Sequence, residues 1–286
     1  MIIKSLETIS LSEITKTFNE AFADYVIQFT ATEEYLQTRW KGAGVDYKLS
    51  YGGFENDTLV GFIIHGIDNW NGLKTAFNVG TGVIPEYRGK RMVKNIYDYA
   101  IPKLKKHGIQ QCLLEVIQEN ERAIRAYHRI GFKEGRELIS LTYTSEANQV
   151  EHGVNTQIQF EIEENIRHVN WDIIQTFWDF YPSWENSISA LIRSAEIYHY
   201  LGMLKDKRLI GYVIFNPKTG YIPQFGVAKG ERGKDYARNL FNKLATLNNR
   251  FSIINVEKQA NQTLKFLTTY GFKKFISQYE MKKILE

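Results

Sequence analysis

The chain contains a single cysteine among its 286 residues, which excludes an internal disulfide framework. Cys112 lies in the apolar run Cys112-Leu113-Leu114 and is expected to be a small buried hydrophobic residue rather than a nucleophile. No apolar stretch approaches the length that crosses a membrane, and the first residues are charged too early for a signal peptide. These features predict a cytoplasmic protein that makes no membrane contact.

The chain also carries little excess charge of either sign. The formal net charge is +4, and neither half carries the dense basic stripe of a dedicated nucleic-acid-binding protein. A Gly-Lys-Ser/Thr phosphate loop is missing, which argues against a nucleotidase. The hydrophobic content of 43% is that of a globular protein, and the length is comfortable for two domains.

The most informative stretch spans residues 83–93. An apolar, β-branched run at 77–84 stops at Pro85, and the basic turn Arg88-Gly89-Lys90 follows. A helical pattern then begins, with apolar residues four positions apart at Met92, Ile96, Ala100 and Leu104. A strand, a basic turn and a helix in this order direct free backbone N–H groups and a positive helix end toward a phosphate.

The rest of the first half alternates between strand and helix patterns. Pro102 is expected to kink or shorten the helix that follows the turn. Asn120 is expected to cap a short helix that stops at Gly131-Phe132. The other predicted elements are a strand at 2–6, helices starting near Ser10 and Thr32, a hairpin at 47–54 and 59–67, and strands at 111–117 and 137–143.

The second half repeats this order. Arg232-Gly233-Lys234 follows Arg88-Gly89-Lys90 by 144 residues, and Gly271-Phe272 follows Gly131-Phe132 by 140 residues. The repeat predicts an internal duplication, with domains at 1–144 and 156–286 and a polar linker at 145–155. The elements predicted for it are strands at 157–162, 198–204, 208–215, 221–228 and 252–256 and helices at 171–181, 187–197 and 261–270.

Two motifs together resemble the GNAT (Gcn5-related) N-acetyltransferase superfamily. The first is Val83-Ile84-Pro85-Glu86-Tyr87-Arg88-Gly89-Lys90, and the second runs from Asn120 to Phe132. The resemblance implies an α/β fold made of two tandem GNAT-like domains, each a mixed, mostly antiparallel sheet flanked by helices. It further implies that the strands at 77–84 and 111–117 splay apart where acetyl-CoA enters.

The resemblance also implies which residues hold acetyl-CoA as a co-substrate, with no metal. Backbone groups near Thr81, Val83 and Ile84 are expected to pair with the pantetheine arm. The N–H groups of the turn are expected to hold the pyrophosphate, and Asn120 adds a possible contact. The predicted turn residues are Arg88, Gly89, Lys90, Arg91, Met92 and Val93.

The sequence departs from the family pattern inside the turn. Arg91 and Val93 occupy positions where glycine and a small residue are usual, so Arg91 adds bulk as well as a charge that can meet a phosphate. The second half has Asp235 at the position of Arg91, and a carboxylate there would repel a pyrophosphate. The second half is therefore expected to be a degenerate copy that does not bind CoA.

The candidate catalytic residues are Tyr127 and Glu115. Tyr127 matches the family's frequent general-acid tyrosine, and a phenol near the leaving sulfur can protonate it. The second half has Leu267 at the corresponding place, which favours catalysis in the first half alone. Glu115 is the candidate base, with His65 and His128 as weaker alternatives. A core aromatic and a surface-facing strand residue are the alternative interpretations of Tyr127 and Glu115.

By analogy with the family, the acceptor site draws on Asp24, Tyr25, Phe29 and Trp70. The predicted activity is transfer of the acetyl group of acetyl-CoA to a primary amine of a small molecule or peptide, by a monomer or homodimer. Two alternatives stay open at this point. One is a non-catalytic acyl-CoA-binding or regulatory module, and the other is transfer of a different acyl or aminoacyl group.

Overall fold

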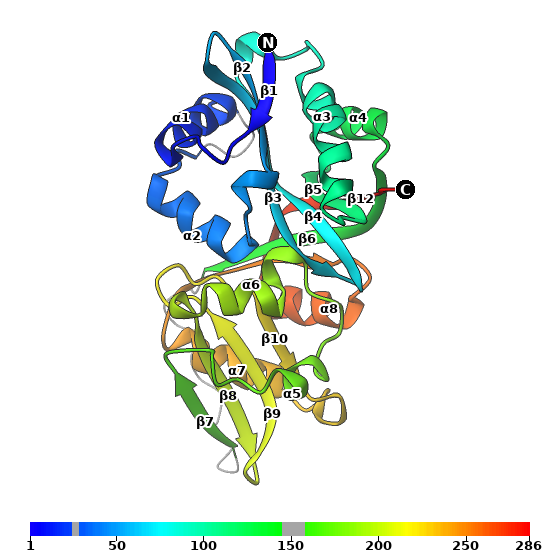
Figure 1. The fold of residues 1–286 in the computed structure, drawn as a ribbon. Coiled ribbons are helices and arrows are strands. Elements are labelled where there is room, and N and C mark those ends of the chain that lie inside the picture. The colour runs from blue at the N-terminus through cyan, green and yellow to red at the C-terminus, as the bar shows by residue number, and fades with distance from the viewer. Residues whose placement is uncertain (25–28, 145–157) are drawn as a thin grey trace. The chain divides into compact units, whose positions relative to one another are not determined.

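The computed structural model describes residues 1–24, 29–144 and 158–286, which form two compact units. The first unit contains Met1–Gly135 and Tyr279–Glu286, and the second contains Arg136–Gln278. Figure 1 shows the strands and helices of each unit. Within the described ranges, no helix is both long enough and apolar enough to cross a membrane.

The sheet of the first unit is mixed and mostly antiparallel, as predicted. Neighbouring strands from β1 to β4 pair antiparallel, whereas β4 and β5 pair parallel. The end of β12 lies on the other side of β5. The strands are β1 (Ile2–Ser5), β2 (Tyr51–Glu55), β3 (Thr58–Trp70), β4 (Leu73–Val83), β5 (Gln111–Ile117) and β12 (Lys273–Ile284).

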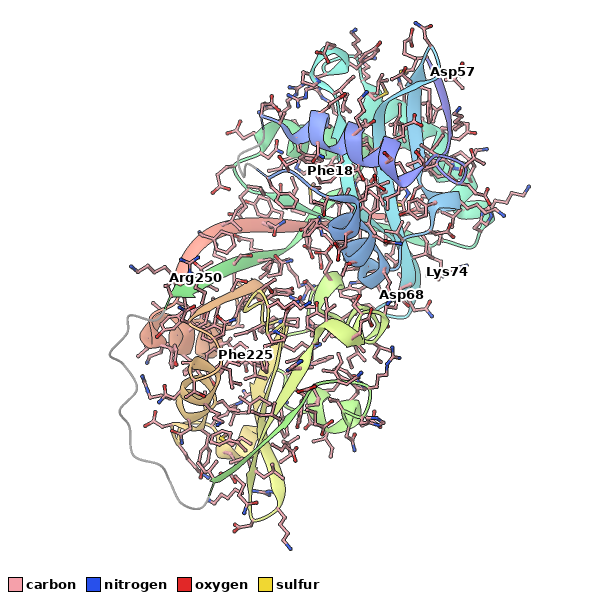
Figure 2. All side chains as sticks on the ribbon, turned by 90° about the vertical axis from the view of Figure 1, so that its left-hand side faces the viewer. Phe18, Asp57, Asp68, Lys74, Phe225 and Arg250 are labelled. Atoms are coloured by element: carbon pink, nitrogen blue, oxygen red, sulfur yellow. The ribbon has the colours of Figure 1, made fainter. Side chains whose placement is uncertain are left out.

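The four helices of this unit begin at side-chain caps or directly after the basic turn. They are α1 (Leu11–Phe22), α2 (Glu33–Ala43), α3 (Met92–Lys106) and α4 (Glu121–Ile130). Ser10 and Thr32 cap α1 and α2, because each hydroxyl accepts a hydrogen bond from the N–H three residues later. Phe18 of α1, labelled in Figure 2, stacks on Phe62 of β3 with ring centroids 6.1 Å apart.

Helix α3 confirms the predicted apolar face and corrects the prediction about its end. Met92, Ile96, Ala100 and Leu104 are all buried in the core of the first unit. Pro102 does not shorten the helix, which continues to Lys106. The proline forfeits one backbone hydrogen bond. The bonds from the His107 N–H to the carbonyl oxygens of Lys103 and Leu104 close the last turn beyond it.

The second unit has two sheets. One is antiparallel and contains β7 (Ile158–Glu163), β8 (His199–Lys205), β9 (Arg208–Phe215) and β10 (Gln224–Val227), in which β10 is an edge strand. In the other, β11 (Arg250–Glu257) pairs antiparallel with β6 (Lys133–Thr144). The helices are α5 (Trp171–Gln175), α6 (Ile188–Arg193), α7 (Tyr236–Ala245) and α8 (Asn261–Tyr270). Helices α5 and α6 are shorter than predicted.

Each half of the chain supplies its last strand to the unit that the other half builds. Residues 136–144 of β6 belong to the second unit, where Leu141 and Tyr143 join the core. Residues 279–284 of β12 belong to the first unit, where Met281 is buried in the core. The first unit is therefore built from two separate stretches of chain, whereas the second is one continuous stretch. The predicted linker at 145–155 lies outside the described residues.

Candidate active site

The basic turn joins β4 to α3 and leaves backbone N–H groups at the start of the helix. The first backbone hydrogen bond of α3 runs from the Asn95 N–H to the Arg91 carbonyl oxygen. The N–H groups of residues 92–94 come before this bond in the helix. Arg91 is the N-cap residue, and its side chain makes no capping hydrogen bond within the described part of the chain. Gly89 has φ +77°, and a Cβ built on it would meet no atom within 4 Å. The turn is therefore open on its outer side.

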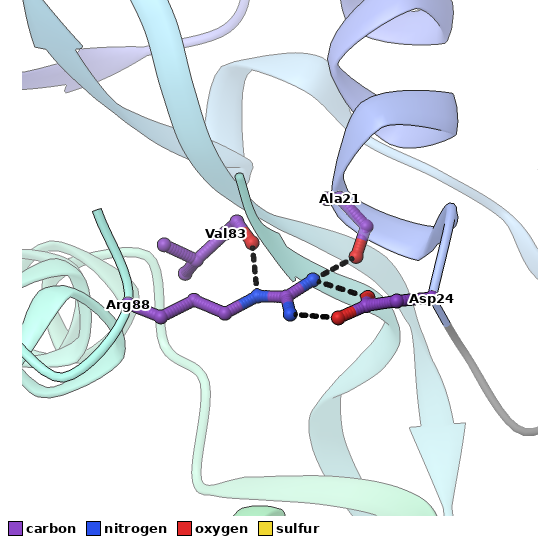
Figure 3. A network of polar contacts seen from close by, with 4 residues as sticks. All are labelled: Ala21, Asp24, Val83 and Arg88. Atoms are coloured by element: carbon purple, nitrogen blue, oxygen red, sulfur yellow. Dashed lines mark hydrogen bonds and ion pairs between the residues drawn. The ribbon is translucent and has the colours of Figure 1, made fainter. Parts of the chain in front are cut away.

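Arg88 points inward from the turn and stabilises it. Its Nη1 and Nη2 donate to the two carboxylate oxygens of Asp24 at 2.5 and 2.7 Å, and Nη2 also donates to the Ala21 carbonyl oxygen (Figure 3). Its Nε donates to the carbonyl oxygen of Val83 at 3.1 Å. The guanidinium also holds the pKa of Asp24 below its ordinary value. Asp24, predicted to attract an amine, is thus engaged by an arginine.

The second unit repeats this arginine clamp. Arg232 Nε donates to the Val227 carbonyl oxygen at 3.2 Å, and Nη2 donates to the Phe177 carbonyl oxygen at 2.8 Å. Its Nη1 donates to Asp179 at 2.7 Å. Arg232 and Val227 follow Arg88 and Val83 by the same 144 residues. The predicted duplication therefore extends to individual hydrogen bonds.

The other side chains of the turn divide into core and surface residues. Met92 is 3% exposed and packs in the core, and Val93 packs against the same core. Lys90 and Arg91 are exposed, and Lys90 Nζ lies 4.9 Å from the centre of the Tyr87 ring. Arg91 has φ +58°, a conformation that favours glycine. Arg91 thus carries a charge at the position where the family usually has glycine.

Several backbone groups at the end of β4, predicted to pair with the pantetheine arm, are already hydrogen-bonded within the protein. The Ile84 N–H donates to the Val60 carbonyl oxygen, and the Ile84 carbonyl oxygen accepts from the Tyr87 N–H. The Val83 carbonyl oxygen accepts from Arg88. Both backbone groups of Ile84 are therefore engaged within the protein.

Strands β4 and β5 separate after a short paired stretch. Their parallel register runs from Thr75 opposite Gln111 to Asn78 opposite Leu114. Beyond this pair, β4 continues to Val83 and β5 to Ile117. The register between β3 and β4 shifts at this level, so that Val79 is the extra residue of a β-bulge. The two strands thus open where the resemblance implies a splay.

Polar side chains gather at the point where the strands separate. Asn78 is 7% exposed, and its Nδ2 donates to the Thr81 Oγ1 at 2.7 Å and to the Tyr97 hydroxyl at 3.1 Å. The Oδ1 of Asn78 is buried and has no hydrogen-bond partner among the described residues. Burial, followed by the nearby Tyr127, raises the pKa of Tyr97 well above its ordinary value. Tyr97 and Tyr127 lie near each other in this apolar core, and the rings of both pack edge-on against Phe132.

Tyr127 and Glu115 lie on opposite faces of the sheet. Tyr127 is 8% exposed and belongs to the core cluster that contains Leu114 and Val116 of β5. Side chains alternate along a strand, so Glu115 points to the other face. Glu115 is half-buried. The predicted acid and base therefore lie on the two sides of β5, the strand that separates from β4.

The remaining predicted residues are only partly brought together with this site. Asn120 caps α4, because its Oδ1 accepts from the Ala123 N–H at 3.1 Å. Phe29 is 46% exposed, with its ring centroid 4.7 Å from that of Tyr35. Trp70 is buried at the end of β3 opposite Leu73, at the other end of β4 from the basic turn. Tyr25 lies outside the described residues.

The other titratable residues differ in their position relative to the opening. His65 is the register partner of Asn78 across β3 and β4, and its ring centroid lies 6.1 Å from that of Tyr97, so it is beside the polar side chains at this point. His128 contacts Glu134 through Nε2 at 3.0 Å and the Phe132 carbonyl oxygen through Nδ1. Cys112 is buried as predicted, and burial raises the pKa of its thiol to about 12. His65 is fully buried, and its Nδ1 donates to the Leu49 carbonyl oxygen at 2.7 Å.

The buried His65 predicts a pH-dependent stability of the first unit. Burial lowers its pKa to about 4, whereas an unfolded histidine titrates near 6.5. Between these values the unfolded chain binds more protons, so the native state loses stability as the pH falls from about 6.5 to about 4, by roughly 3 kcal/mol in all. Thermal unfolding at several pH values measures this. We expect His65→Asn, which keeps a donor for Leu49, to reduce the slope over this window. Parallel curves for the two proteins would contradict the assignment.

Asn78 and Tyr97 were not expected from the sequence. Asn78 interrupts the apolar run at 77–84, and a buried amide inside a strand is a weak signal of a polar site. Tyr97 follows the turn on the buried face of α3, where it is indistinguishable from a core aromatic residue. Their hydrogen bond depends on the register of β4 and on the rotation of α3.

Comparison with known proteins identifies relatives of both halves. Residues 13–132 match the model of the Acetyltransferase (GNAT) family, and residues 156–285 match that of the Acetyltransferase (GNAT) domain. N-alpha-acetyltransferase 30 of Schizosaccharomyces pombe is 25% identical over 120 residues, which are 42% of this chain and 72% of that protein.

Solved structures resemble the whole chain. A tandem GNAT protein from the clavulanic acid biosynthesis pathway has a TM-score of 0.73 at 11% identity, covering 100% of this chain and 98% of that one. A GCN5-related N-acetyltransferase from Sphaerobacter thermophilus has a TM-score of 0.69 at 12% identity, covering 100% and 96%. At these identities the likeness concerns the fold.

Proposed function

The chain belongs to the GNAT acetyltransferase family, with one such domain in each half, and we propose that its first half transfers an acetyl group from acetyl-CoA to a primary amine. The observation that carries the proposal is the joint position of the open basic turn and the gap between β4 and β5. Both lie at the same end of β4, and Tyr127 belongs to the same core cluster as Leu114 and Val116 of β5. The turn can bind phosphate, and the gap between the strands can take an extended arm. The two together suit a nucleotide that carries a thioester arm better than a nucleotide alone.

The residues of the turn fit a pyrophosphate. The N–H groups of residues 92–94 and the positive end of α3 favour an anion, and Lys90 and Arg91 add two exposed positive charges. Arg88 is already bound to Asp24, so we assign it to holding the turn rather than to the phosphate. Met92, Val93 and Gly89 would contribute backbone groups only.

The residues of the gap fit an acyl-pantetheine arm. The buried Oδ1 of Asn78 is an acceptor without a partner among the described residues, which costs free energy unless a ligand donates to it. Thr81 lies beside it, and the bulge at Val79 leaves a residue outside the β3–β4 ladder. We infer that Asn78 meets a donor on the arm. Acetyl-CoA would supply an acetyl group already activated as a thioester.

Tyr127 and Glu115 are assigned the two proton transfers. Tyr127 would donate its phenolic proton to the departing sulfur from the α4 side of the gap. Glu115 would take a proton from the attacking amine, directly or through water, from the other face. Their placement on opposite faces suits a reaction in which the leaving group and the nucleophile occupy different sides of one carbonyl carbon.

The acceptor is proposed to be a primary amine of a small molecule or peptide. The relative named N-alpha-acetyltransferase 30 makes a peptide α-amino group one candidate. Phe29 remains a proposed contact because it is exposed, whereas the buried Trp70 lies at the far end of β4. Acetyl-CoA is incubated with the protein and a panel of peptide and small-molecule amines, and CoA release is measured. Release that depends on one class of amine is expected, and acetyl-CoA binding without turnover on any amine would contradict the proposal.

Replacing Asn78 by isoleucine separates ligand binding from stability. We expect acetyl-CoA affinity to fall at least about tenfold, because the acceptor offered to the arm is lost. The thermal midpoint is expected to change little, because the unpartnered buried oxygen is removed together with the two hydrogen bonds that Nδ2 donates to Thr81 and Tyr97. The second half has a fully buried isoleucine, Ile222, at the position 144 residues later. Calorimetric titration and thermal unfolding measure both effects. Unchanged affinity would contradict the role of Asn78.

A further inference from the structure

The second unit contains a cavity of about 450 Å³ beside its own copy of the basic turn. All of the lining residues belong to the second unit. The cavity lies between β10 and β11, with the start of α7 and one side of α8 completing its wall. Its volume is within the range of small-molecule sites. The arginine clamp of Arg232 borders it, so the second copy of the fold has kept an open cavity as well as the turn.

The polar residues of the first site are replaced by apolar ones in the second. Asn78 and Thr81 of β4 correspond to Ile222 and Phe225, 144 residues later, and Tyr127 corresponds to Leu267, 140 residues later. Ile222 and Leu267 are fully buried. Phe225, labelled in Figure 2, lines the cavity. The groups assigned above to thioester binding and proton transfer therefore have no polar counterparts here.

Aromatic rings dominate the wall of the cavity. The ring centroids of Phe225 and Phe266 lie 6.4 Å apart, and Phe177 lies 6.1 Å from Tyr212. Trp178 also lines the cavity, and its Nε1 donates to the Tyr212 hydroxyl at 3.1 Å. Such rings offer large apolar surface, and burying apolar surface of a ligand against them is favourable.

The charges of the wall are balanced, and three of the six charged residues form ion pairs. Three acidic residues line the cavity, and these are Asp179, Glu231 and Asp235. Three basic residues line it as well, and these are Arg232, Arg238 and Lys265. Arg232 is bound to Asp179, and Glu231 is bound to Lys234 at 2.9 Å. Asp235 stands at the start of α7 with φ +60°, where the first half has Arg91. A carboxylate at this helix end opposes a pyrophosphate.

One edge strand faces the cavity. β10 is the edge of the four-stranded sheet, and among its outer backbone groups the Val227 carbonyl oxygen accepts from Arg232. The outer edge of β11 is already used, because Ser252 bonds to Gly220 and Ile222 and the Ile254 carbonyl oxygen accepts from Asn186. Edge strands present backbone N–H and C=O groups that seek hydrogen-bond partners. A ligand with one amide or ester group can pair with such an edge while its apolar part contacts the rings.

We propose that the second unit binds a small uncharged apolar molecule, alkyl or aryl, that carries an amide or ester group and no phosphate. This assignment concerns a different site from acetyl transfer and does not rest on the proposed function of the first half. The degenerate copy would then bind a ligand of its own, and the residues that differ from those of the first half would determine the chemistry of that ligand.

The test titrates the full-length protein with octanamide, octanoate and CoA, with hydrogen–deuterium exchange locating each ligand and calorimetry measuring affinity. Octanamide is expected to bind with a dissociation constant on the order of 10⁻⁴ M and to protect residues 223–227 and 262–269. Octanoate is expected to bind more weakly, and CoA to leave these segments unchanged. The proposal would be overturned if octanamide gave no protection, if octanoate bound as tightly as octanamide, or if CoA displaced octanamide.

Two variants act on the cavity in different ways. Phe266→Lys brings a charge to its wall, and Ala237→Leu fills space at the start of α7. Each is expected to raise the dissociation constant for octanamide at least about tenfold. Phe275→Lys is the matched control, because Phe275 is 49% exposed in the same unit and does not line the cavity. Thermal unfolding of each variant checks folding. Wild-type affinity in a folded Phe266→Lys or Ala237→Leu protein would refute the assignment.

Discussion

Replacing Tyr127 by phenylalanine is expected to lower the kcat for acetyl transfer by about 10²- to 10⁴-fold, the usual contribution of a positioned general acid. The substitution removes one hydroxyl from a ring that is already buried in the core, so the fold should tolerate it. Acetyl-CoA affinity is expected to stay within about twofold, because the turn and the gap are unchanged. Steady-state kinetics and calorimetric titration measure the two quantities separately.

A second tyrosine controls for the loss of a buried hydroxyl. Tyr270 of α8 is 8% exposed, as is Tyr127, but it belongs to the second unit. Tyr270→Phe is expected to leave the kcat unchanged. An unaffected kcat in Tyr127→Phe would remove Tyr127 from the mechanism, and an equal loss in both variants would show that the effect is structural.

Replacing Gly89 by alanine is expected to weaken acetyl-CoA binding about tenfold or more. Its φ of +77° is a conformation that L-residues with a Cβ adopt at a cost of roughly 1–2 kcal/mol. The added Cβ meets no protein atom, so any steric conflict arises only when a phosphate approaches the turn. Calorimetric titration with acetyl-CoA and thermal unfolding measure the affinity and the backbone strain.

Gly233 provides the matched control for Gly89. It has φ +75° in the corresponding turn of the second unit, and a Cβ there also meets no atom within 4 Å. Gly233→Ala is expected to show a similar loss of stability with unchanged acetyl-CoA affinity. Equal loss of affinity in the two variants would contradict the assignment of acetyl-CoA to the first half alone.

Local signals in the sequence predicted many of the elements. The strand at 111–117 and the helix at 261–270 were predicted with the bounds that the structure has. Apolar periodicity and the following αL glycine decide such bounds within a few residues. Asn120 was likewise recognised as a cap, because a cap acts on the N–H three residues later.

Partners that lie far apart in the chain could not be predicted in this way. The two last strands, β6 and β12, have similar patterns, and nothing local decides which unit each one joins. The pairing of Arg88 with Asp24 spans 64 residues, so both were assigned to ligands instead of to each other. Asn78 was missed because its importance depends on the register at which β4 leaves β5.

A crystal structure of the protein soaked with acetyl-CoA tests the central claim most directly. We expect electron density for the pyrophosphate at the N–H groups of residues 92–94, with the pantetheine arm running past Asn78 and Thr81 toward Tyr127. Density at the turn formed by residues 232–237 instead, or no density along residues 78–94 at saturating acetyl-CoA, would contradict it.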